Sequence, residues 1–85
     1  MKYGKAVRIL TEAYINNKCK NHVVIEFQSY KGVSITFRVY EWTNNTITKG
    51  YSSIFYSNDP FFEEKVNEIL AILRGEKEPE LEDYS

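Results

Sequence analysis

Residues 22–42 of the 85-residue chain read HVVIEFQSYKGVSITFRVYEW, and this stretch decides the fold. Its apolar residues fall on every second position, both before and after the segment Tyr30-Lys31-Gly32. An alternation with a period of two is typical of a β-strand that buries one face. The stretch therefore predicts two antiparallel strands that form a hairpin.

The length of the hairpin loop follows from matching the apolar sides of the two strands. A two-residue loop of Lys31 and Gly32 would place Phe27 opposite Thr36, so that an apolar side would meet a polar one. A three-residue loop, with Gly32 in the left-handed position of a bulge, places Phe27 opposite Ile35 instead. The apolar residues that precede Phe27 then also meet apolar partners. The sequence predicts the three-residue loop.

A third strand is predicted at about residues 47–56, after a tight turn at Asn44-Asn45, because two consecutive Asn residues suit the positive backbone angles of such turns. A two-residue turn places Ile54 on the core face of the sheet and Tyr51 and Phe55 on the outer face. A slip by one residue would bury Tyr51 and Phe55 instead. The alternation is compatible with both registers, and we take the first as the prediction.

Two amphipathic helices flank the strands. The first is predicted from about Tyr3 to Ile15, with Asn16-Asn17 as its end. The second is predicted to begin at Asp59-Pro60, where Asp59 caps free backbone amides and Pro60 takes the first helical position. It is predicted to end at Arg74-Gly75, because glycine readily adopts the left-handed conformation that closes many helices.

Together these elements predict a single α+β domain with the order α-β-β-β-α, in which a three-stranded antiparallel sheet carries both helices on one face. Residues 1–75 would form the globular part. Residues 76–85 hold four Glu and one Asp and are predicted to be an acidic, flexible tail. The order of elements from Tyr3 to Arg74 resembles that of the double-stranded RNA-binding domain. That family grips phosphates with a basic cluster at the start of its second helix, whereas this helix begins Pro60-Phe61-Phe62-Glu63-Glu64, so the resemblance implies a topology and no functional residue.

Composition limits the class of protein. Hydrophobic residues make up 42% of the chain and charged residues 27%, which is the balance of a soluble globular domain. A single cysteine, Cys19, permits no internal disulfide, and no apolar run approaches the roughly 18 residues of a membrane span. We therefore expect a cytoplasmic protein that makes no contact with a membrane. The abundance of Ile, Lys and Asn, which have A/T-rich codons, favours a low-GC bacterium, or a phage or mobile element, as the source.

The net charge of −1 conceals a division along the chain. Residues 1–58 hold eight Lys or Arg against three acidic residues, a net charge of +5, and residues 59–85 hold three against nine, a net charge of −6. Such a division creates opposite potentials on one small body and bears on its partners. It is compatible with a solvated acidic helix and tail, with an acidic mimic of nucleic-acid phosphates, and with a cover for the basic outer face.

The outer face of the predicted sheet is too aromatic for a surface that meets only water. Tyr, Trp and Arg are also the side chains that most often dominate binding energy at interfaces. The alternatives are that cross-strand aromatic pairs merely stiffen the sheet, or that the tail folds back over them. The residues predicted to bind a partner are His22, Val24, Arg38, Tyr40, Trp42, Ile47, Lys49, Tyr51 and Phe55.

Enzymatic chemistry finds little support in the sequence. Cys19 and His22 could form a thiolate and its base, but no third residue is identifiable to orient them. One Cys and one His cannot supply the four ligands of a usual zinc site, and the four glycines are too far apart for a phosphate-binding loop. We therefore expect no enzyme, no cofactor and no metal.

The first hypothesis is an interaction module that binds a protein partner, or a second copy of itself, through the outer face. The second is a protein that binds single-stranded nucleic acid by stacking bases on the same aromatic residues. A pI of about 5.8 disfavours the second hypothesis, because dedicated nucleic-acid-binding domains usually have a pI above about 9.

Overall fold

The predicted hairpin is present in the computed structural model, which describes residues 1–84. Strands β1 (His22–Ser29) and β2 (Val33–Thr43) pair antiparallel across a three-residue loop, and Phe27 lies opposite Ile35 as predicted. The left-handed position of the loop is held by Lys31, with φ of 54°, while Gly32 takes φ of 122°. The second angle is one that few residues other than glycine adopt, so the glycine is needed where the sequence placed it.

Strand β3 (Thr46–Tyr56) follows the turn at Asn44 and Asn45, whose φ angles of 53° and 64° confirm the predicted type of turn. At the tip, Trp42 lies opposite Ile47, but beyond Glu41 the register shifts by one residue. Because Lys49 then pairs with Glu41, Thr48 is the extra residue of a β-bulge.

The bulge overturns the predicted register in the body of β3. Val39 lies opposite Tyr51 and Ile35 opposite Phe55, so Tyr51 and Phe55 face the core side and Ile54 faces outward. The physical reason is that the extra residue satisfies two demands at once. The Asn-Asn turn keeps its two-residue geometry, and Tyr51 and Phe55 face the core in place of Ile54 and Tyr56, which brings two aromatic rings to the core face where the predicted register had one.

Helix α1 (Tyr3–Ile15) has the predicted bounds, and helix α2 (Phe62–Leu73) begins two residues later than Pro60, where it was predicted to begin. Asp59 nevertheless accepts hydrogen bonds from the Phe61 backbone N–H at 2.7 Å and from Lys65 Nζ at 2.6 Å. These bonds, the one from Lys65 foremost, hold the pKa of Asp59 below its ordinary value. The Asp59 carboxylate thus caps a free backbone amide before α2 as expected, although the first regular helical residue is Phe62 and not Pro60.

The end of α2 is closed by Gly75, as predicted. Gly75 has φ of 75° and its N–H donates to the Ile72 carbonyl at 3.1 Å, while the N–H of Glu76 reaches back to the Ala71 carbonyl at 2.8 Å. This pair of bonds is the Schellman arrangement, which satisfies carbonyls that the last helical turn leaves free.

The sheet has four strands in the order β1-β2-β3-β4, so the prediction of three strands was wrong. Strand β4 (Glu82–Asp83) lies in the acidic tail and pairs antiparallel with β3 at Lys49 and Gly50. Two residues are too few to leave a readable alternation in the sequence, and the acidic composition of the tail pointed away from a strand. The strand is formed because β3 offers it an edge.

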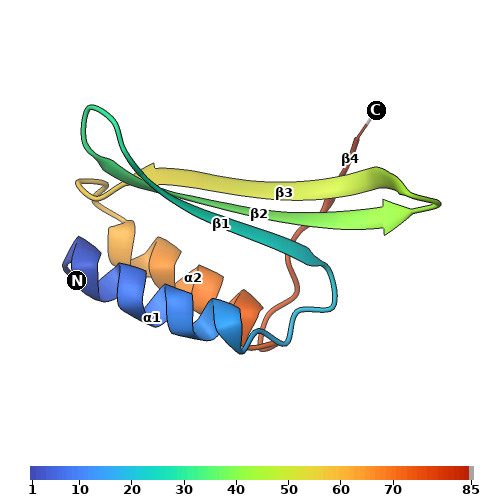
Figure 1. Cartoon of the computed structure of the whole chain (residues 1–85), viewed down its shortest axis with the longest axis horizontal. Coiled ribbons are helices and arrows are strands. Elements are labelled where there is room, and N and C mark those ends of the chain that lie inside the picture. Colours follow the sequence, from blue (N-terminus) through green and yellow to red (C-terminus); the bar gives the residue numbers. More distant parts are fainter. Residues whose placement is uncertain (85) are drawn as a thin grey trace.

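Figure 1 shows α1 and α2 running along the same side of the sheet, with the tail rising from the helix layer past β3. The buried core lies between the two layers, and its largest fully enclosed side chains include Phe37, Leu10 and Ile69. The T-shaped contact between Phe55 and Phe62, at 5.6 Å between ring centroids, joins β3 to α2. Within residues 1–84, no helix combines the length and apolar character that a membrane crossing requires.

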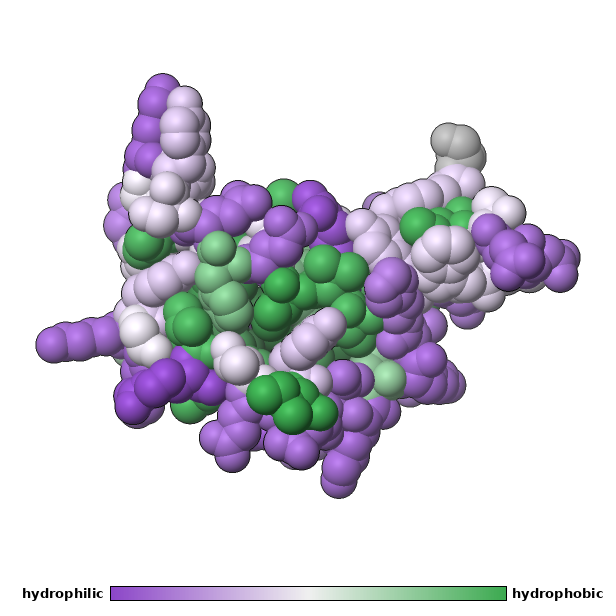
Figure 2. Space-filling model, viewed as in Figure 1, coloured by the Kyte–Doolittle hydropathy of each residue, from purple (hydrophilic) through white to green (hydrophobic). Residues whose placement is uncertain are grey.

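Along β1 the core is only partly covered. β1 forms an edge of the sheet over eight residues, and its Ile25 and Phe27 are only half-buried. Figure 2 shows hydrophobic residues gathered in the middle of the view, between the strands above and the helices below. The core therefore reaches the surface along this side.

Candidate interaction surface

The face of the sheet opposite the helices, here called the outer face, follows from the observed registers. Side chains that pair across the ladder point to the same face, and successive residues alternate between faces. The outer-face residues of the three long strands are His22, Val24, Glu26, Gln28, Ser34, Thr36, Arg38, Tyr40, Trp42, Ile47, Gly50, Ser52, Ile54 and Tyr56.

Four rings meet at one end of the outer face, and we call this group the aromatic corner: His22, Tyr40, Trp42 and Tyr84. The ring centroids of His22 lie 5.7 Å from Tyr40 and 5.9 Å from Trp42, and Tyr84 meets Tyr40 edge-on at 6.4 Å. The indole N–H of Trp42 donates to Nδ1 of His22 at 3.0 Å. The indole N–H is a donor only, and this bond gives it a partner.

Trp42 is the most informative member of the aromatic corner, because it is 50% exposed and its indole N–H is already hydrogen-bonded to His22. An exposed indole usually samples several rotamers and loses that freedom when it binds. Here the bond to His22, and the contact of His22 with Tyr40, fix the ring before any partner arrives. The corner is thus a preorganised apolar surface with its polar atom already satisfied.

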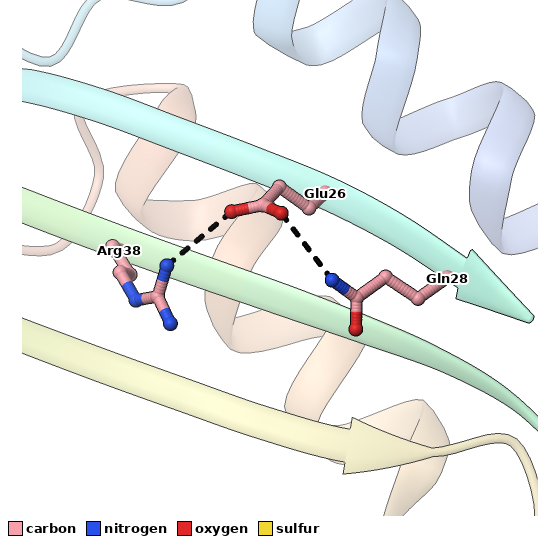
Figure 3. Close-up of polar contacts among 3 residues, drawn as sticks. All are labelled: Glu26, Gln28 and Arg38. Carbon is pink, nitrogen blue, oxygen red and sulfur yellow. Dashed lines mark hydrogen bonds and ion pairs between the residues drawn. The ribbon is translucent and has the colours of Figure 1, made fainter. Parts of the chain in front are cut away.

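Beside the aromatic corner lies an ion pair on the outer face. Arg38 Nη1 lies 3.3 Å from Glu26 Oε1, and the other oxygen of Glu26 accepts a bond from Gln28 Nε2 at 3.3 Å (Figure 3). Both charged side chains remain partly exposed, so the pair adds little to stability. Its main effect is to offset the positive charge of Arg38 on this face.

The far end of the outer face carries two exposed apolar residues that the predicted register had turned inward. Ile54 is 59% exposed and Tyr56 is 48% exposed, whereas their β2 neighbours Thr36 and Ser34 are buried. Their exposure follows from the other register of β3, shifted by one residue. The alternation in the sequence permits that register as readily as the predicted one.

Of the nine residues predicted to bind a partner, six lie on the outer face: His22, Val24, Arg38, Tyr40, Trp42 and Ile47. The other three, Lys49, Tyr51 and Phe55, lie on the helix side, and their predicted outward placement was wrong. Lys49 Nζ lies 4.0 Å from Glu41 Oε2, and Phe55 is 2% exposed. The cause is the bulge at Thr48, which turns every following residue of β3 over.

Tyr51 shows what these residues do on the helix side. Its ring meets Phe37 edge-on at 6.3 Å, and its hydroxyl donates to Glu68 Oε1 at 3.2 Å. Burial, and then the nearby negative charge of Glu68, raise the pKa of the Tyr51 hydroxyl above its ordinary value. Tyr51 therefore joins β3 to α2.

The tail reaches the aromatic corner through Tyr84, in line with the alternative in which the tail folds back over the aromatic residues. The backbone N–H of Tyr84 donates to the Thr48 carbonyl at 3.0 Å, and its ring lies over Gly50. A glycine inside a strand often marks a close approach by another group, and Gly50 was the available signal. The tail therefore covers one part of the outer face and leaves Trp42 open.

The two residues considered for catalysis, Cys19 and His22, lie in different environments. Cys19 is half-buried, and His22 is engaged by Trp42. Among residues 1–84, no group of three or more His, Cys, Asp or Glu side chains is arranged to hold a metal ion.

Comparison of this chain with models of known protein families, with curated proteins and with solved structures finds no significant match. Its function is therefore inferred from the residues and contacts described above.

Proposed function

We propose that the protein is a non-enzymatic interaction module that binds another protein, or a second copy of itself, through the outer face of its sheet. The observation that carries this proposal is Trp42, half-exposed and held in one orientation by His22. Trp and Tyr supply large rigid contact areas, and a residue that is fixed before binding loses little entropy in the complex.

The surface around Trp42 has the composition of a protein interface. Tyr40 and Ile47 extend the apolar centre, and the pair of Arg38 and Glu26 supplies polar groups at its edge. An apolar centre with a polar rim is the usual anatomy of a specific protein–protein contact. Ile54 and Tyr56 widen the exposed apolar area beyond what the predicted register provided.

Single-stranded nucleic acid remains the second candidate, since bases could stack on the same rings. Two observations favour protein over it. Arg38 is paired with Glu26, and Lys49 lies on the helix side of the sheet, so two cations that the predicted register placed on the outer face are not free there to meet phosphates. Strong binding to nucleic acid depends on neutralising several phosphates.

The test begins with partner capture by the wild-type chain and by Trp42→Ala, with Tyr30→Ala as the matched control. Tyr30 is 73% exposed but lies in the loop between β1 and β2, at the opposite end of the sheet from Trp42. We expect Trp42→Ala to weaken binding by about thirtyfold, the effect of losing roughly 2 kcal/mol at an interface hot spot. Tyr30→Ala should bind like the wild type, and both thermal midpoints should stay close to that of the wild type.

Two further measurements separate the alternatives. Sedimentation over a concentration series identifies a second copy as the partner if self-association disappears in Trp42→Ala. Nuclease treatment of the captured material separates protein from nucleic acid, since capture that is lost with nuclease, and that falls steeply with salt, would favour the second candidate. Equal capture by Trp42→Ala and the wild type would contradict the proposal.

The role assigned to His22 can be tested without touching Trp42. His22→Ala removes the acceptor of the indole N–H and should release the ring, which lowers the fluorescence anisotropy of the single tryptophan. Binding should weaken by several-fold, because the freed ring must be ordered again in the complex. Unchanged anisotropy together with weakened binding would show that His22 contacts the partner directly.

A further inference from the structure

The C-terminal residues 80–84, here called the tail segment, lie on β3 as an added strand would. Within this segment, Asp83 pairs with Lys49 and Glu82 with Gly50, and the Tyr84 N–H donates to the Thr48 carbonyl. Strand β4 takes the edge of β3 that faces away from β2, and Figure 1 shows the tail segment passing β3 there. Adding a strand to an open sheet edge is a common way to recognise an extended peptide.

Gly50 gives this edge a recess for an aromatic ring. A Cβ atom at position 50 would stand only 2.6 Å from the Tyr84 hydroxyl and 2.7 Å from its ring, so any side chain there would exclude the tyrosine. The recess opens into a shallow hollow of about 360 Å³, which Gly50, Ser52 and Tyr84 help to line. Glycine weakens a strand, and its presence is explained where another group must approach the backbone closely.

The tail segment is held by few contacts. Strand β4 has only two residues, and Tyr84 is 55% exposed although it fills the recess. Leu81 is its one residue packed partly against the core. A segment with so little buried surface and so few hydrogen bonds can leave its site at low cost.

We propose that the recess at Gly50 and the adjoining edge of β3 bind an extended, acidic segment of a partner protein that carries an aromatic residue. The chain's own tail segment occupies the site until the partner's segment displaces it. This inference rests on the proposed function for the existence of a partner. The chemistry of the partner's segment follows from the resident one. An aromatic ring covers Gly50, and an acidic side chain stands opposite Lys49.

The site adjoins the surface that carries the proposed function. Tyr84 contacts Tyr40, a member of the aromatic corner, at 6.4 Å between ring centroids. A partner could therefore place an aromatic residue over Gly50 and cover Trp42 with its neighbouring surface. Departure of the tail segment would also expose more of Tyr40.

The experiment uses the full chain and an acetylated peptide with the sequence of residues 77–84, KEPELEDY. In the Tyr84→Ala chain the resident ring is missing, so the peptide should bind saturably and perturb the Gly50 amide signal. The wild-type chain should bind it about tenfold more weakly, because its own tail segment competes at a high effective concentration. Gly50→Ala in the Tyr84→Ala background should abolish binding, and so should Tyr84→Ala within the peptide.

Several outcomes would overturn the inference. Absence of saturable binding to the Tyr84→Ala chain would do so, and so would equal binding after Gly50→Ala. If Gly50→Ala unfolds the chain, the wild-type chain provides the test instead. A Gly50 amide signal that does not shift at excess peptide would then overturn the inference. Wild-type dimers that disappear in Tyr84→Ala would make a second copy's tail segment the occupant instead.

The failure of this inference and that of the proposed function can be told apart. Tyr30→Ala in the Tyr84→Ala background should leave peptide binding unchanged, because Tyr30 lies in the loop between β1 and β2, at the other end of the sheet from Gly50. If the peptide still binds but partner capture does not depend on Trp42, only the proposed function is contradicted. Capture that depends on Trp42, together with a peptide that never binds, would remove only the site at Gly50.

Discussion

Ile54 and Phe55 are neighbours in the sequence and have opposite environments. Phe55 is 2% exposed and meets Phe62 of α2, while Ile54 is 59% exposed on the outer face. Both are large apolar residues in one strand, so hydrophobicity alone could not assign their faces. The assignment depends on whether Thr48 is counted within the ladder or as a bulge.

Substituting each residue by alanine tests this assignment. Phe55→Ala leaves a cavity between β3 and α2 and should lower the free energy of unfolding by about 3 to 5 kcal/mol. Ile54→Ala removes an exposed side chain and should change it by no more than about 0.5 kcal/mol. Urea denaturation of the two variants provides the measurement. A larger loss for Ile54→Ala would mean that the register without the bulge is correct.

The helices and the first hairpin could be predicted from the sequence, because each depends on local pattern. The stripe of α1 and the left-handed glycine after α2 are signals within a few residues, and matching apolar faces fixed the register of β1 against β2. The register of β3 and the existence of β4 depend on contacts across the sheet, which periodicity does not record. The same limit explains the candidate site. Trp42 and Tyr40 of β2 lie on the outer face as predicted, whereas Tyr51 and Phe55, which follow the bulge in β3, lie on the helix side.

The glycine at the end of α2 allows a prediction at the level of an element. Gly75→Ala puts a Cβ into a left-handed residue and should lower the free energy of unfolding by about 1 kcal/mol. Its nearest neighbour would be Lys18 Cβ at 3.5 Å, an ordinary contact, so the cost arises from the backbone. Gly4→Ala in α1 is the control. An added Cβ there would meet no atom within 4 Å, and the substitution should raise the free energy of unfolding by about 0.5 kcal/mol. Thermal unfolding of both variants checks this, and shifts in the same direction would contradict it.

The charge division of the sequence persists in the folded molecule. Of the five ion pairs found within residues 1–84, one, between the amino terminus and Glu63, joins the basic and acidic parts. The pair of Lys77 with Glu68, for example, lies wholly within the acidic part. The two regions therefore largely keep opposite electrostatic potentials at the surface, and such potentials steer association with partners.

Hydrogen exchange should rank the strands by how fully they are enclosed. β2 pairs with a neighbour on both sides and holds Ile35, Phe37 and Val39 at the centre of the core, so its amides should exchange most slowly. The amides of β4 and Tyr84 should exchange fastest among those bonded in the sheet. Mass spectrometry of peptic fragments gives the ranking. Protection of the tail equal to that of β2 would mean that the tail opens only when the whole domain unfolds.

The open edge of β1 has a consequence for handling the protein. Residues 22–29 include no proline and no lysine, the residues that commonly guard an exposed strand edge against unwanted pairing, and their only acidic residue is Glu26. The adjacent side of the sandwich is the one where the core reaches the surface. In concentrated preparations, precipitation should therefore begin along β1, and a lysine substituted for Val24 would act as a gatekeeper that keeps the chain in solution.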